Sequence, residues 1–177
     1  MKSTIYALFA SLVLLLGFCP CAAAMSVNYE PLQLNFQLPD GWTVAPQEAV
    51  EPEDFAEFGE EERTEKLAEG VLTGTYTRDY GDVSADLRVI AVNSVGAIGL
   101  LQGEKIMNAT TKQLGRMLRN FVCSERSTVE VGKYTMLRIS GSFGSDSQLR
   151  ILQYLFTAEK ATFRFIFVCQ RDAFKGL

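Results

Sequence analysis

The strongest constraint on the fold is a series of runs that alternate apolar and polar side chains or are rich in β-branched residues. Both patterns are typical of strands with one face in a core and the other in water. In the last run Phe163, Phe165 and Phe167 fall on one face and Arg164 on the other. The runs cover residues 32–38, 42–44, 71–78, 83–93, 128–131, 134–143, 148–157 and 162–169.

One segment has the period of an amphipathic helix instead. Leu114, Met117, Leu118 and Phe121 lie at i, i+3, i+4 and i+7, with basic side chains on the other side. The links between the last four runs are short enough for hairpins, which favours a meander. We therefore expect an α+β fold: a single antiparallel sheet of six or seven strands, with one main helix on one face.

A leader of the secretory type precedes these runs. Lys2 is followed by an apolar run over residues 5–18 and by three alanines at 22–24, which is the order that signal peptidase reads. The run is shorter than the roughly 20 residues that cross a bilayer. The sequence therefore predicts a signal peptide at 1–24 and a single domain at 25–177 that does not span a membrane. The expected location is the periplasm, the extracellular space or a compartment like the thylakoid lumen.

A lipid anchor is the alternative fate of this leader. Acylation would require a small residue directly before Cys19 or Cys21, and Phe18 and Pro20 stand there. Soluble release is therefore favoured over a membrane-tethered lipoprotein of the same fold.

Acidic residues are concentrated in one segment, which we interpret as a surface loop or weak helix at 47–70. Between Glu48 and Glu69 there are ten acidic residues against Arg63 and Lys66 only. Such a run can be a solvated face, a loose site for divalent cations, or a contact for a basic protein partner. It lacks EF-hand spacing. We expect it to be the least ordered part of the domain, and Glu60, Glu61 and Glu62 are the candidate partner-binding residues.

Cysteine usage predicts one disulfide. Cys123 and Cys169 remain after removal of the leader, and two cysteines in an exported domain are more often bonded than free. A metal site is disfavoured, because the chain has no histidine and two thiolates do not complete a zinc shell.

Composition disfavours catalysis and nucleic-acid binding. The absence of histidine removes the commonest general base, and neither Gly-x-Ser-x-Gly nor Ser-x-x-Lys occurs. We predict no enzyme activity and no cofactor, with an unusual histidine-free hydrolase as the alternative. Without Lys2 the domain has 16 basic and 21 acidic residues, so the overall basic balance that phosphate contacts favour is lacking.

The order of elements and one short motif carry a resemblance. The stretch Phe36-Gln37-Leu38-Pro39-Asp40-Gly41-Trp42, followed by paired strands, a helix, a meander and a closing helix, resembles the PsbP-like family. That family includes an extrinsic lumenal subunit of photosystem II, a nuclear Ran-binding factor and many exported bacterial proteins. The resemblance implies an α/β/α sandwich and a non-catalytic binding or accessory role. It transfers no functional residue, because the motif is a structural turn in the family.

Overall fold

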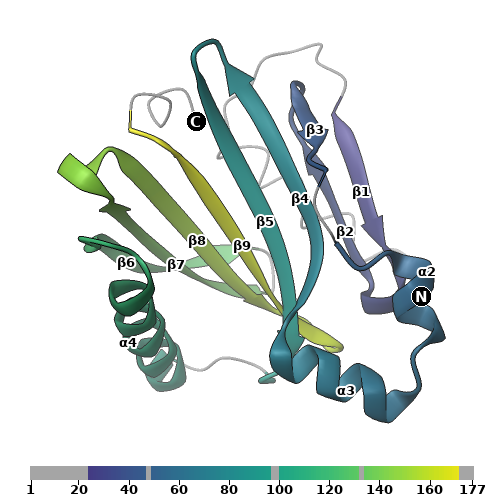
Figure 1. The fold of residues 1–177 in the computed structure, drawn as a ribbon. Coiled ribbons are helices and arrows are strands. Elements are labelled where there is room, and N and C mark those ends of the chain that lie inside the picture. The colour runs from purple at the N-terminus through teal and green to yellow at the C-terminus, as the bar shows by residue number, and fades with distance from the viewer. Residues whose placement is uncertain (1–23, 47–48, 97–99, 132–133, 172–177) are drawn as a thin grey trace.

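A computed structural model describes residues 24–46, 49–96, 100–131 and 134–171 (Figure 1). The predicted signal segment up to residue 23, with Cys19 and Cys21, lies outside these ranges, and so does the expected closing helix after residue 171. None of the helices in the described ranges is long and apolar enough to cross a membrane.

The described residues form a seven-stranded sheet in which every neighbouring pair is antiparallel, as predicted. The last four strands form the expected meander, and the final strand pairs with β5, which joins the two halves of the chain. In order across the sheet the strands are β3 (Trp42–Val44), β4 (Val71–Tyr80), β5 (Val83–Asn93), β9 (Ala161–Gln170), β8 (Leu149–Thr157), β7 (Tyr134–Phe143) and β6 (Val122–Val131).

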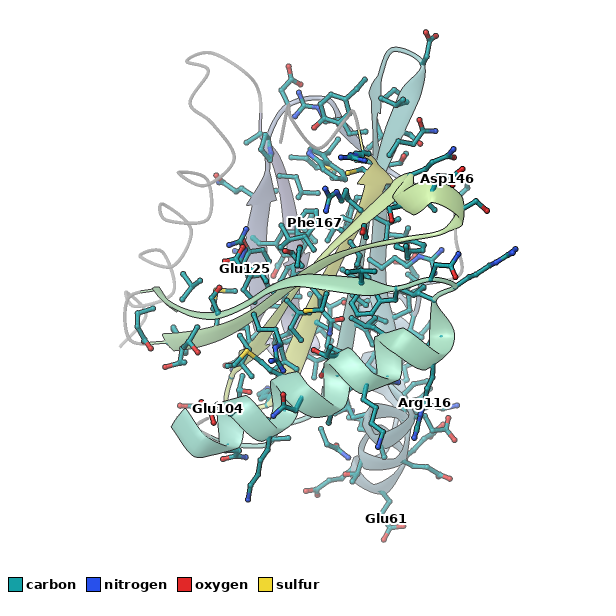
Figure 2. The ribbon with its side chains drawn as sticks, turned by 90° about the vertical axis from the view of Figure 1, so that its left-hand side faces the viewer. Glu61, Glu104, Arg116, Glu125, Asp146 and Phe167 are labelled. Atoms are coloured by element: carbon teal, nitrogen blue, oxygen red, sulfur yellow. The ribbon has the colours of Figure 1, made fainter. Side chains whose placement is uncertain are left out.

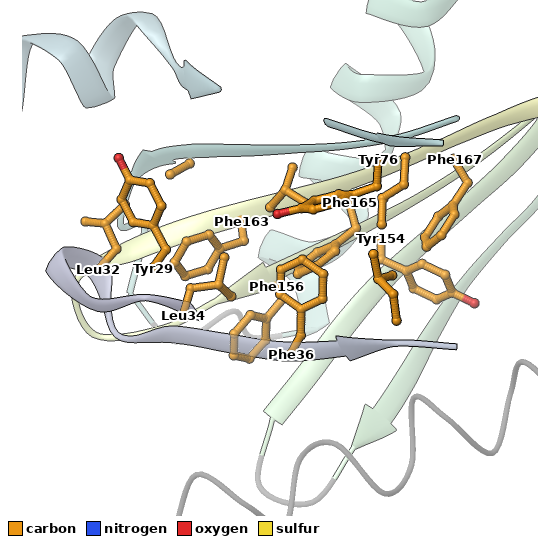
Figure 3. Close-up of a cluster of buried hydrophobic side chains, with 14 of the residues drawn as sticks. Tyr29, Leu32, Leu34, Phe36, Tyr76, Tyr154, Phe156, Phe163, Phe165 and Phe167 are labelled. Atoms are coloured by element: carbon orange, nitrogen blue, oxygen red, sulfur yellow. The ribbon is translucent and has the colours of Figure 1, made fainter. Parts of the chain in front are cut away.

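A two-stranded sheet covers one face of this large sheet. It is made of β1 (Met25–Tyr29) and β2 (Leu34–Leu38), joined by the short 3-10 turn η2 (Glu30–Leu32). Phe36 of β2 is 1% exposed, and its ring centre lies 5.3 Å from that of Phe165 in β9. Figure 3 shows these aromatic side chains between the two sheets. The turn at residues 39–41 is therefore a strand bend, which carries the chain from β2 to β3 at the edge of the large sheet.

Helix α4 (Leu100–Met117) covers the opposite face beside β6 and β7 (Figure 1). Met107 and Leu114 on the helix pack into an apolar layer with Leu137, Ile139 and other sheet residues. A longer aromatic layer fills the other side, under β1 and β2. The phenylalanines of β9 belong to this second layer, as their alternation predicts, so one sheet has apolar layers on both faces.

The structure corrects the predicted disulfide, because Cys123 and Cys169 are both free. Cys123 pairs with Gly141 on β7, and the same row continues through Ile151 on β8 to Val168 on β9. The two cysteines are thus three strand spacings apart, or about 14 Å, and their side chains pack against opposite faces. A disulfide needs Cα atoms within about 7 Å. The number of cysteines was therefore an insufficient guide, because it says nothing of the two strands, β7 and β8, that separate Cys123 from Cys169.

Candidate functional site

The acidic segment forms two short helices, so the helical alternative is the one that the structure contains. We call α2 (Pro52–Glu57) and α3 (Glu60–Glu69) the acidic helix pair. Pro52 occupies the first turn of α2, where its missing N–H costs nothing. Gly59 separates the helices, and Gly70 ends α3 with a φ of +99° that favours glycine.

Two apolar side chains anchor the pair to the domain. Phe55 is 1% exposed, and its ring lies edge-on against Tyr29, with centres 6.0 Å apart. Leu67 is buried on the inner side of α3, which packs at the end of β5. Asn93 at that end of β5 donates a hydrogen bond of 3.3 Å to the carbonyl of Thr64. The helix pair is therefore docked on the protein and presents its other side to solvent.

The two basic side chains of the pair are engaged with the protein itself. The Arg63 guanidinium lies 5.8 Å from the ring centre of Phe55 and donates a hydrogen bond to the carbonyl of Ala56. The Lys66 ammonium lies 5.9 Å from the ring centre of Phe58. Among the described residues the one ion pair joins Arg138 and Glu125 on the sheet, so the carboxylates of α2 and α3 have no ion-pair partner there.

The candidates Glu60, Glu61 and Glu62 begin α3, and all three are exposed. Their position in the first turn also has a structural use. The preceding Gly59 provides no side-chain cap, and carboxylates near a helix amino terminus offset its dipole. The structure therefore brings the three together, but it gives them different surroundings.

Glu61 and Glu62 line a shallow hollow on the outer surface, together with Gly59, Glu65, Lys66 and Glu69. Residues 61, 65 and 69 are four apart and lie on the side of α3 away from Leu67. Glu60 is not part of the hollow. Sequence reasoning singled out the three consecutive glutamates, and a helical periodicity applied to the same segment would have selected 61, 65 and 69. Figure 2 shows Glu61 at the lower end of the molecule.

The suggestion of a loose divalent cation site gains no geometric support. In the described part of the chain no three acidic, cysteine or histidine side chains are placed to share a metal ion. The outer glutamates of α3 are spread along one helix instead of converging on a point.

The carboxylates do affect the tyrosines beneath them. Burial raises the pKa of Tyr29, and Glu51, Asp54 and Glu53 raise it further. Burial, with a smaller contribution from Glu51, raises the pKa of Tyr76 to about 12. Both phenols therefore remain protonated at neutral pH, and neither acts there as a base.

A second polar cluster on the sheet was not anticipated from the sequence. Arg138 on β7 forms a 2.7 Å ion pair with Glu125 on β6 and interacts electrostatically with Tyr154 on β8. Burial raises the pKa of Tyr154, while Arg138 lowers it. These residues come from three strands, so only the register of the meander could have brought them together. The cluster links the three strands, although the Nε atom of the Arg138 guanidinium is buried without a hydrogen-bond partner among the described residues.

Comparison with known proteins adds information on the fold. No family model and no curated protein sequence matches the chain. Among solved structures, cyanobacterial PsbP (CyanoP) from Synechocystis sp. PCC 6803 aligns with a TM-score of 0.56 at 12% identity, over 90% of this chain and 89% of that one.

Two further structures align less well. LpqN, described as involved in cell envelope biogenesis of Mycobacterium tuberculosis, has a TM-score of 0.45 at 14% identity, over 88% of this chain and 83% of that one. A Pseudomonas aeruginosa protein of unknown function, a putative regulator, has a TM-score of 0.47 at 8% identity, over 86% of each chain. The alignment with cyanobacterial PsbP, the antiparallel sheet and the placement of α4 together show that this chain has a PsbP-like fold.

Proposed function

We propose that this chain is a non-catalytic binding or accessory protein that works outside the cytoplasm, and that the acidic helix pair is its contact with a basic protein partner. The proposal rests on which charged side chains of the helix pair have partners within the protein. The carboxylates point outward without ion-pair partners in the described residues, while Arg63 and Lys66 are held on aromatic rings. A basic surface brought to α3 would therefore meet uncompensated negative charge.

The leader and the fold support the remaining parts of the proposal. The signal-peptide pattern at 1–24 supports export. The PsbP-like fold agrees with a role exercised through a surface, which is the role that the sequence resemblance implies. The absence of histidine from the sequence makes acid–base chemistry at neutral pH harder to provide.

The test begins with capture of the partner from native envelope extract by the exported protein. Affinity is then measured as salt rises from about 0.05 to 0.5 M, which shortens the Debye length to contact distances. We expect affinity to fall steeply. We also expect the triple variant Glu60→Gln, Glu61→Gln, Glu62→Gln to bind about tenfold more weakly, because exposed ion pairs contribute up to about 1 kcal/mol each.

Two comparison variants make the test specific. Glu61→Gln, Glu65→Gln, Glu69→Gln neutralises the outer side of α3 and should weaken binding at least as much as the consecutive triple. Asp82→Asn, Asp86→Asn, Glu159→Gln removes the same charge from exposed positions elsewhere and should bind like the wild type. Thermal stability should stay within about 1 kcal/mol in all three. If the affinity changes neither with salt nor in the two α3 variants, the helix pair is only a solvated face and does not bind the partner.

A further inference from the structure

Helix α4 carries a stripe of positive charge on the side away from the sheet. Lys105, Lys112 and Arg116 are seven and four residues apart, so they share one side of the helix, and Arg119 follows in the turn just after it. All four are exposed, whereas Met107, Thr110 and Leu114 on the other side are buried. We call these four residues the basic stripe. From Lys105 to Arg116 it extends about 16 Å along the helix.

The surroundings of the stripe are nearly free of opposing charge. Between Leu87 and Ser124 the sequence contains a single acidic residue, Glu104, which lies at the amino end of α4 (Figure 2). Arg126 on β6 donates a hydrogen bond to Asn108 and adds a fifth cation beside the helix. Exposed acids on the elements that follow α4 include Glu125 and Glu130 on β6 and Asp146 after β7, and Glu125 is already paired with Arg138. None of the stripe residues is in an ion pair with a described residue.

Exposed apolar side chains lie at one end of the stripe. Met117 is 70% exposed at the last position of α4, and Val122 is 59% exposed at the start of β6. They are two of the four large hydrophobic side chains that the described residues leave exposed. A straight row of cations with adjoining apolar side chains suits an extended anionic surface with an apolar interior.

We infer that the basic stripe of α4 docks the protein onto an anionic phospholipid bilayer. The cations meet the headgroup phosphates, and Met117 and Val122 enter the boundary between headgroups and acyl chains. This surface is separate from the acidic helix pair, since α4 packs against β6 and β7 and α3 against β5 (Figure 1). The inference therefore does not rest on the proposed partner contact, and the two surfaces could be occupied together.

The test uses the exported protein and vesicles of phosphatidylcholine with and without phosphatidylglycerol. We expect co-sedimentation with the anionic vesicles only, decreasing as salt rises. The variant Arg116→Gln, Arg119→Gln should reduce partitioning about five-fold for each charge removed, because a basic side chain near an anionic membrane contributes about 1 kcal/mol. Arg116→Lys, Arg119→Lys keeps the charge and should bind like the wild type.

A matched control separates the stripe from net charge. Arg88→Gln, Lys160→Gln removes two exposed cations that lie outside α4 and outside the acidic helix pair and should leave partitioning unchanged. Equal binding to both kinds of vesicle, no sedimentation with anionic vesicles, or equal losses in the stripe and control variants would each overturn the inference. So would capture of an acidic protein through the stripe without any binding to vesicles.

Discussion

Tyr29 lies between the aromatic layer and the carboxylates of the acidic helix pair. It is 2% exposed, and its hydroxyl has no hydrogen-bond partner among the described residues. A buried polar atom without a partner costs about 1–3 kcal/mol. We therefore expect Tyr29→Phe to raise the free energy of unfolding by up to about 1 kcal/mol in urea titrations at neutral pH. A clear loss of stability would mean that the hydroxyl has a partner in solution.

The raised pKa of Tyr29 also leads to a prediction for the stability of the protein at alkaline pH. The pKa of Tyr29 is raised above its ordinary value of 10.0, and that of Tyr76 is raised to about 12. The folded state then holds these protons more tightly than the unfolded state does. The stabilisation is complete below pH 10.0 and is lost as pH rises through the folded pKa values. Urea titrations above pH 10.0 should show wild-type stability falling, and Tyr29→Phe should show a smaller fall.

At the scale of elements, the strands that the sequence predicted best are those with a regular alternation beside a turn. The run at 134–143 coincides with β7, and that at 162–169 differs from β9 by one residue at each end. The exposed edge strand β6 begins at Val122, six residues before the predicted start, because Ser124, Glu125 and Arg126 are all polar. An edge strand can have polar side chains on both faces, so periodicity does not detect it.

Other elements depend on contacts between segments that are distant in the sequence, and a local hydrophobic pattern carries no information on such contacts. The short strand β1 gains its place by pairing with β2, and the pairing of β5 with β9 joins segments about 80 residues apart. The candidate site, too, could be predicted only in part from the sequence. The charge of the helix pair was visible in the sequence, whereas the docking of Phe55 on Tyr29 and the resulting outer side of α3 required the fold.

The attachment of α4 to the sheet predicts contrasting effects at two glycines near Phe121. A Cβ at Gly141 on β7 would lie 2.5 Å from the Phe121 ring and 2.7 Å from the Val122 carbonyl oxygen. That oxygen belongs to strand backbone paired with β7 and has little room to move. We expect Gly141→Ala to lower the free energy of unfolding by about 2 kcal/mol, within the usual range for overpacking.

Gly115 on α4 provides the control for this prediction. A Cβ there would have Phe121 at 4.0 Å as its nearest neighbour, which is ordinary contact. Alanine in place of a helical glycine stabilises by about 0.5–1 kcal/mol. Gly115→Ala should therefore raise the unfolding free energy in the same urea titration. Similar effects of the two substitutions would mean that Phe121 does not fill the space between α4 and the sheet.

At the scale of the whole molecule, one sheet separates two apolar layers, and this separation governs the chemistry of the cysteines. Cys169 is 3% exposed on a central strand, and burial raises its pKa to about 11, although Arg150 opposes the shift. Only about one thiol in a thousand is then ionised at pH 8, and thiolate is the reactive form. Cys123 is half-buried on the edge strand β6, under the other layer.

The domain without residues 1–24 should consequently contain two free thiols with very different reactivity. Alkylation without a reductant, followed by mass spectrometry, should label Cys123 in the native state and Cys169 only slowly. Because the central strand opens only with the sheet, the labelling rate of Cys169 should rise with urea in parallel with global unfolding. The variant Cys123→Ser isolates that slow phase. A protein that resists alkylation at both positions until it is reduced would instead contain the disulfide, and the strand order between β6 and β9 would have to differ.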